Sequence, residues 1–89
     1  MPQVIADPEE IIKFAQRLRV FNTLLENNTK QLEGQFRELS ETWKDREHQK
    51  FAREFEHTMR VIHQFNETFK QQEPVLYRKA QILMDFQSR

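Results

Sequence analysis

The stretch SETWKDREHQKF, residues 40–51, lies near the middle of this 89-residue chain and contains its only tryptophan. Long segments with apolar residues at helical spacing run into this stretch and out of it. Neither glycine nor proline marks the boundary between them, so a turn here must be tight and must use side-chain caps. Thr42 and Asp45 are both residue types that are favoured at helix N-caps. We therefore expect a turn at about residues 42–45, with Trp43 closing the end of the apolar core.

The segment before the turn has the features of one continuous helix, from about residue 8 to residue 41. Asp7 is a candidate N-cap, and Pro8 suits the first helical position. Apolar residues then recur at steps of three and four, which is the pattern of an amphipathic helix. They are Ile11, Phe14, Leu18, Phe21, Leu25, Leu32, Phe36, Leu39 and Trp43. Asn28 interrupts this stripe, either as a polar residue that fixes register or as a residue at its solvent-exposed edge.

The segment after the turn repeats this pattern from about residue 46 to residue 86. Its stripe is formed by Phe51, Phe55, Met59, Ile62, Phe65, Phe69, Leu76, Ala80 and Leu83. Pro74 lies inside it and removes the hydrogen bond to the Lys70 carbonyl, a loss of about 3 kcal/mol. Because the apolar register continues through Pro74, we expect a kink there, and a break before a short separate helix is the alternative. The fold class is all-α, a single antiparallel two-helix hairpin.

Composition excludes several classes of partner. Fourteen basic and 14 acidic residues are interspersed and give a net charge of zero, which argues against a nucleic-acid binder. No apolar run approaches the roughly 18 residues that span a bilayer, so we expect no membrane insertion. The first ten residues lack the pattern of a signal peptide. We expect a protein that is cytoplasmic or exported without a cleavable signal peptide.

Catalytic and metal-binding patterns are incomplete. Glu54 and His57 have the Glu-x-x-His spacing of di-iron bundles, but a second such pair is missing. His48, His57 and His63 do not have the spacing of a zinc helix. There is no cysteine and no glycine-rich phosphate loop. We expect no catalytic residue, no metal and no cofactor, and a metal-dependent helical-bundle enzyme is the alternative of another class.

Two long rods that touch along one line bury too little apolar surface to be stable alone. Ordering each residue costs on the order of 1.5 kcal/mol, whereas burying a large apolar side chain returns about 1.5–3 kcal/mol. The stripes are also wide, as in four-helix bundles. We expect the hairpin to dimerise into such a bundle, most simply as a homodimer. The expected interface consists of Ile11, Leu18, Leu25, Leu32, Phe55, Ile62 and Phe69.

The length, the two long helices and the motif Trp43-Lys44-Asp45 at mid-chain, followed by FAREF at residues 51–55, resemble the WXG family. That family belongs to the early secretory antigenic target superfamily of small type VII secretion substrates. The resemblance implies hairpins that pair antiparallel into a four-helix bundle, as a homodimer or with a related small helical partner. It also implies binding and delivery without catalysis, with Trp43 and Asp45 as a recognition feature at the turn. A component of the secretion apparatus is a further implied partner.

Two positions depart from the family pattern. Asp45 stands where the family has glycine. Tyr77 is followed four residues later by Gln81, where the family's export signal has an acidic residue. We therefore keep two hypotheses for this non-catalytic interaction module: a WXG-type secreted protein, and an intracellular adaptor or chaperone for a secretion or toxin component.

Overall fold

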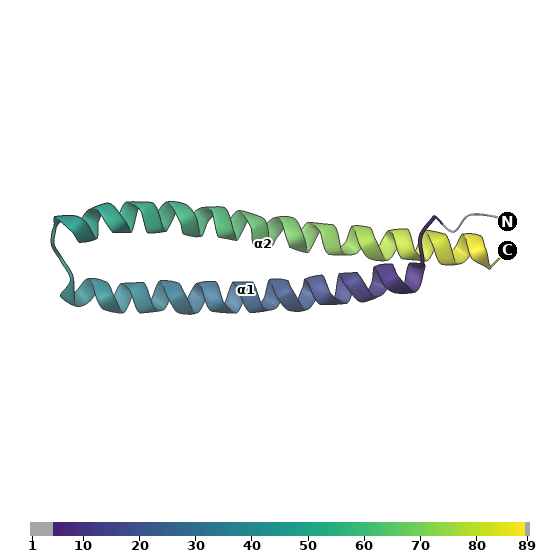
Figure 1. Cartoon of the computed structure of the whole chain (residues 1–89), viewed down its shortest axis with the longest axis horizontal. Coiled ribbons are helices and arrows are strands. Elements are labelled where there is room, and N and C mark those ends of the chain that lie inside the picture. The colour runs from purple at the N-terminus through teal and green to yellow at the C-terminus, as the bar shows by residue number, and fades with distance from the viewer. Residues whose placement is uncertain (1–4, 89) are drawn as a thin grey trace.

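Two long α-helices fold back on each other to form the whole of the described structure, a computed structural model that covers residues 5–88 (Figure 1). Helix α1 spans Pro8–Thr42 and helix α2 spans Arg46–Gln87. The described residues include no strand. The molecule is a rod with extents of 68 × 17 × 17 Å. The predicted antiparallel hairpin is therefore confirmed.

Aspartate side chains cap the start of both helices. Asp7 Oδ1 accepts a hydrogen bond from the Glu9 amide at 2.9 Å, and Asp45 Oδ1 accepts one from the His48 amide at 3.0 Å. These bonds satisfy amides that have no partner within the helix. Thr42 instead ends α1, and its hydroxyl donates to the Leu39 carbonyl. Asp45 is thus the residue that starts the second helix.

The connection between the helices consists of residues 43–45, within the predicted range. No non-glycine residue among those described has a positive φ. Asp45 itself is extended, with φ of −84° and ψ of −176°. Because this turn requires no left-handed conformation, glycine has no advantage at that position.

Helix α2 continues through Pro74 without interruption. The alternative of a short separate last helix is therefore wrong. Pro74 lies on the exposed side of α2, where water can bind the carbonyl group that the proline leaves unpaired. The predicted kink near this residue remains a prediction.

The line of closest contact between the helices, which we call the seam, contains mainly small and polar side chains. No large side chain among the described residues is fully buried. The buried residues are separated by multiples of seven positions within each helix. They are Pro8, Ala15, Asn22 and Thr29 in α1, and Met59, Asn66 and Ala80 in α2. The helices approach each other along the rows where side chains are small. The hairpin therefore buries little of its apolar surface.

The interface residues expected from the sequence lie beside this seam. Ile11, Leu18 and Leu25 are half-buried, whereas Leu32 is 47 % exposed. Asn28 is exposed, so it is an edge residue, and the buried amides of the seam belong to other positions. The predicted partner interface and the seam are therefore neighbouring rows, and the predicted stripe of the second helix also included Met59 and Ala80 of the seam.

Candidate interaction surface

The seam divides the rod into two faces of different chemistry. On one face, the rings of Phe21 and Phe69 meet edge to face with centroids 5.8 Å apart. On the other face, Lys70 Nζ lies 3.4 Å from a Glu26 carboxylate oxygen. Residues three or four positions apart share one side of a helix, so each contact identifies a row that continues along the rod.

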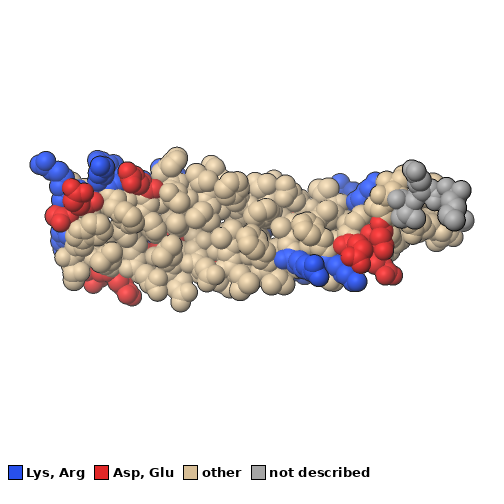
Figure 2. All heavy atoms as spheres, viewed as in Figure 1, with Lys and Arg blue, Asp and Glu red and all other residues tan. Residues whose placement is uncertain are grey.

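The rows that include Phe21 and Phe69 form what we call the uncharged face. Figure 2 shows that Lys, Arg, Asp and Glu are absent along its middle and gather near its ends. Its residues are Ile11, Phe14, Leu18, Phe21, Leu25, Asn28, Leu32, Gln35 and Leu39 in α1, and Phe51, Phe55, Thr58, Ile62, Phe65, Phe69, Gln72 and Leu76 in α2. Neither helix combines the length and apolar character that a membrane crossing needs within the described residues.

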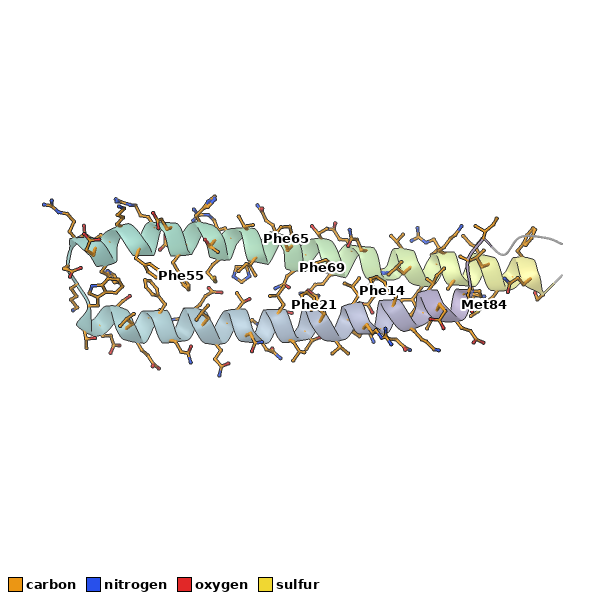
Figure 3. The ribbon with its side chains drawn as sticks, viewed as in Figure 1. Phe14, Phe21, Phe55, Phe65, Phe69 and Met84 are labelled. Atoms are coloured by element: carbon orange, nitrogen blue, oxygen red, sulfur yellow. The ribbon has the colours of Figure 1, made fainter. Side chains whose placement is uncertain are left out.

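Large side chains on the uncharged face are exposed to an unusual extent for a small protein. Phe14 is 58 % exposed, Phe21 53 % and Phe65 56 %, and Figure 3 shows these rings along the rod. Six of the seven expected interface residues form the half-buried inner rows of the same face: Ile11, Leu18, Leu25, Phe55, Ile62 and Phe69. Leu32, the seventh, is more exposed. The site prediction omitted the three exposed phenylalanines, although all of them belong to the apolar stripes.

Ion pairs between the helices define the opposite, charged face. Arg19 Nε lies 2.8 Å from Glu73 Oε1, and His63 Nε2 lies 2.8 Å from Glu33 Oε1. The Lys70–Glu26 pair lies between them along the rod. Ion pairs as exposed as these contribute about 0–1 kcal/mol each to the stability of the fold. Their main effect is to favour this register of the two helices over other registers. Solvated charges also make this face a poor site for burial against a partner.

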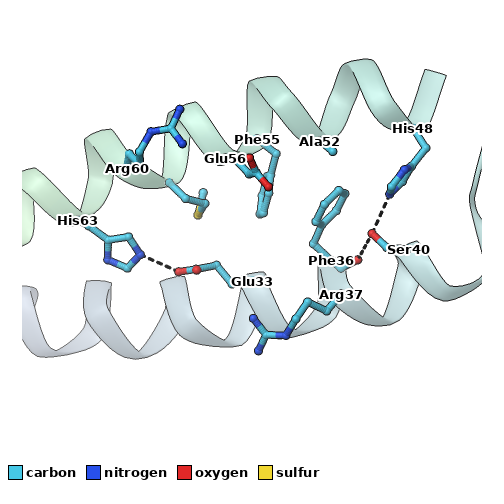
Figure 4. Close-up of a pocket in the computed structure, with 11 residues that line it drawn as sticks. Glu33, Phe36, Arg37, Ser40, His48, Ala52, Phe55, Glu56, Arg60 and His63 are labelled. Atoms are coloured by element: carbon cyan, nitrogen blue, oxygen red, sulfur yellow. Dashed lines mark hydrogen bonds and ion pairs between the residues drawn. The ribbon is translucent and has the colours of Figure 1, made fainter. Parts of the chain in front are cut away.

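A cavity of about 730 Å³ opens between the helices near the turn (Figure 4). Phe36, Phe55 and Met59 form its apolar wall, and Glu33 and His63 are paired at one end. This region is large enough to hold a side chain from a partner, and its lining also includes the charged residues Arg37, Glu56 and Arg60. It contains no constellation that would select one ligand.

Aromatic side chains close the rod at the turn. Trp43 is half-buried, and its ring lies 5.1 Å from that of His48 and 5.9 Å from that of Phe51. Phe36 stacks on His48 at 5.5 Å. The structure thus brings the tryptophan of the turn motif against the first two turns of α2, beside the Asp45 cap.

The side chains at this end do not form a nucleophile. Ser40 Oγ lies 2.7 Å from His48 Nε2 and 2.9 Å from the Phe36 carbonyl oxygen. The Ser40 hydroxyl donates its one hydrogen to the Phe36 carbonyl, so His48 Nε2 must donate to Ser40 Oγ and cannot accept a proton from it. Among the described contacts, no carboxylate orients His48. Glu54 and His57 are both exposed. Among residues 5–88 no three side chains of metal-binding type come together.

Comparison with known protein families, curated proteins and solved structures finds no match to this chain. The faces and the seam of the hairpin therefore supply the basis for a proposal about function.

Proposed function

We propose that this chain is a non-catalytic, WXG-like interaction module whose uncharged face docks against partner helices to complete a four-helix bundle. The observation that supports this most directly is the placement of Phe14, Phe21 and Phe65, each more than half exposed on one face of a rod that fully buries no large side chain. Contiguous apolar surface of this kind marks a protein interaction site.

The exposed area of the chain supports the same proposal. A compact monomer of 10.9 kDa exposes about 5,600 Å², whereas this chain exposes 7591 Å². The excess is about 2,000 Å². Obligate homodimers bury about 1,000–2,500 Å² on each partner. Docking one face would therefore remove an area typical of a permanent interface.

The chemistry of this face also restricts the partner. Burial of a charge without a counter-charge is unfavourable, so a partner must offer a similarly uncharged apolar surface. A second copy of this hairpin, or a related small helical protein, meets that requirement. Phe21, Phe65 and Phe69 lie near mid-length, where interface hot spots concentrate, and aromatic residues are the type enriched in interfaces. We assign these three residues to the centre of the interface and pair the hairpins antiparallel, with their turns at opposite ends.

Substitution of Phe65 by glutamate tests this function. Phe65→Glu places a charge at the centre of the face, and we expect association to weaken by at least about a hundredfold, which is roughly 2.7 kcal/mol. Sedimentation velocity across a concentration series measures the change, and circular dichroism checks that the helices persist. Thr23→Glu, an exposed change on the charged face at a similar level, should leave association intact. A folded wild-type monomer that captures no helical partner would contradict the proposal.

The second hypothesis, an intracellular adaptor or chaperone, is favoured by one observation. Gln81 occupies the position where the resemblance implies an acidic export residue after Tyr77. Fractionation of producing cells separates the two roles. Appearance in the medium without a lysis marker supports a secreted WXG-type protein, and strict retention supports the adaptor.

A further inference from the structure

The seam is polar in the middle of the rod. Asn22 and Thr29 occupy consecutive seam positions in α1, seven residues apart. In α2, Asn66 is followed after seven residues by Glu73, whose side chain is only 15 % exposed, and after seven more by Ala80. Four polar residues therefore meet at mid-length, where the seam of a coiled coil normally has apolar ones.

Two of these polar side chains make the closed hairpin less stable than an apolar seam would. Asn22 is 7 % exposed and Asn66 is 3 % exposed. Asn22 Oδ1 and both polar atoms of the Asn66 side chain have no hydrogen-bond partner among the described residues. A polar group closed off in this way loses its hydration without compensation. Separation of the helices at this level returns both amides to water and recovers that loss.

Aromatic side chains hold the helices together at the turn end, by which we mean residues 30–65. Phe36 of α1 lies with its ring centroid 4.6–5.6 Å from three rings of α2. These rings belong to His48, Phe51 and Phe55. In the rest of the described chain, the rings of Phe21 and Phe69 make the one aromatic contact between the helices. The turn end is thus joined both by the chain itself and by most of the ring packing.

The opposite half of the rod consists of what we call the arms, residues 8–29 of α1 and 66–87 of α2. The start of α1 and the end of α2 lie together at this end, without a connection between them (Figure 1). Ala15 and Ala80 are the most completely buried residues here, at 0 % and 1 % exposure. A methyl group stabilises far less on burial than an aromatic ring does. The arms are therefore joined less strongly than the turn end.

We propose that the hairpin opens from its free end: the two arms separate while the aromatic cluster keeps the turn end closed. The polar middle of the seam sets how often the arms are open, because opening restores hydrogen bonds with water to Asn22 and Asn66. Regions with few buried apolar contacts are the ones that open locally in native proteins. The hairpin is then a hinged device rather than a rigid rod.

Opening has a consequence for the surface of the molecule. The uncharged face includes Phe21 from one arm and Phe69 from the other, and their rings touch only when the arms are together. This face therefore exists as one continuous surface in the closed state alone. The inference goes beyond the proposed function, because the arms open whether or not a partner docks.

Native-state hydrogen exchange, followed by NMR on the unsubstituted chain, measures the opening. A separated arm of about 22 residues is only marginally helical in water, so its amides exchange. We expect protection factors at least about tenfold lower for residues 15–25 than for residues 33–40. Both stretches belong to α1, which avoids the local effect of Pro74 in α2. Residues 33–40 lie nearer to a helix end than residues 15–25, so fraying acts against the expected contrast.

Substitutions identify the cause of the opening. Asn22→Leu combined with Asn66→Leu should raise the protection of residues 15–25 by at least about tenfold. Asn27→Leu, at an exposed position of α1, controls for the better helix propensity of leucine and should change it by less than about twofold. Phe36→Leu, in the aromatic cluster, should lower the protection of residues 33–40 about fivefold and leave residues 15–25 unchanged.

Three results would overturn the inference. Equal protection along α1 would show one cooperative unit, and unchanged protection in the double leucine variant would show that the amides do not govern opening. A loss in both stretches of Phe36→Leu would show that the arms exchange only by complete unfolding. Repeating the measurement at several protein concentrations separates this inference from the proposed function. Docking of a second copy across both arms should raise their protection, whereas a contrast that persists unchanged would support the opening and remove self-association.

Discussion

Individual carboxylates decide where the helices of this rod begin. Asp45 Oδ1 accepts a hydrogen bond from the His48 amide at 3.0 Å, and this bond caps α2 after a connection of only three residues. The same residue type performs the same task at Asp7. A short polar side chain thus replaces the conformational freedom that glycine would give to a turn.

Removal of this cap should destabilise the hairpin. Asp45→Ala leaves the first amides of α2 without the carboxylate, and we expect a loss of about 1 kcal/mol in the free energy of unfolding. Urea denaturation followed by circular dichroism measures it. Asp45→Asn retains an acceptor and should lose only a few tenths of that energy. An alanine variant as stable as the wild type would show that the cap is dispensable.

Helix α2 carries a proline in its interior, and this element is where a single substitution should improve the fold. Pro74→Ala restores an amide that can donate to the Lys70 carbonyl, and we expect a gain of about 1–3 kcal/mol in the free energy of unfolding. Pro8 occupies the first helical position, which has no such hydrogen bond to regain, so Pro8→Ala should give no comparable gain. An unchanged unfolding energy for Pro74→Ala would show that the helix already accommodates the proline without loss.

The sequence was sufficient to predict the features that depend on residues close together in the chain, namely the caps and the bounds of the helices. Asp7, Pro8 and Asp45 act within one helical turn, so the bounds of both helices followed from residue type. Which row forms the seam depends on how closely two backbones approach, and the small residues Ala15 and Ala80 decide this. Ala80 belonged to the predicted stripe of the second helix, whereas Ala15, Asn22 and Asn66 belonged to neither stripe, because both stripes were built from apolar and mostly large side chains.

Pairing across the hairpin was beyond prediction from spacing. Glu33 meets His63, and Glu26 meets Lys70, only because the turn length sets the two helices in a particular register. The same register places Phe21 beside Phe69. The division into an uncharged and a charged face therefore became visible with the structure.

The whole molecule exposes about 2,000 Å² more than a compact chain of its mass, so its stability should depend on association. We expect the thermal midpoint to rise with protein concentration, because a dimer that unfolds to monomers is stabilised by mass action. Scanning calorimetry over a hundredfold concentration range measures the shift. Phe65→Glu should abolish the dependence, and a midpoint independent of concentration in the wild type would indicate a self-sufficient hairpin.

The single indole of the chain packs against His48 and Phe51 at one extreme of the rod. Its fluorescence is therefore a label-free optical probe of that extremity alone. Because Phe51 belongs to the uncharged face, a partner that covers this face along its whole length should change the surroundings of the indole and shift its emission wavelength. An unchanged spectrum on association would show that docking stops short of the tip.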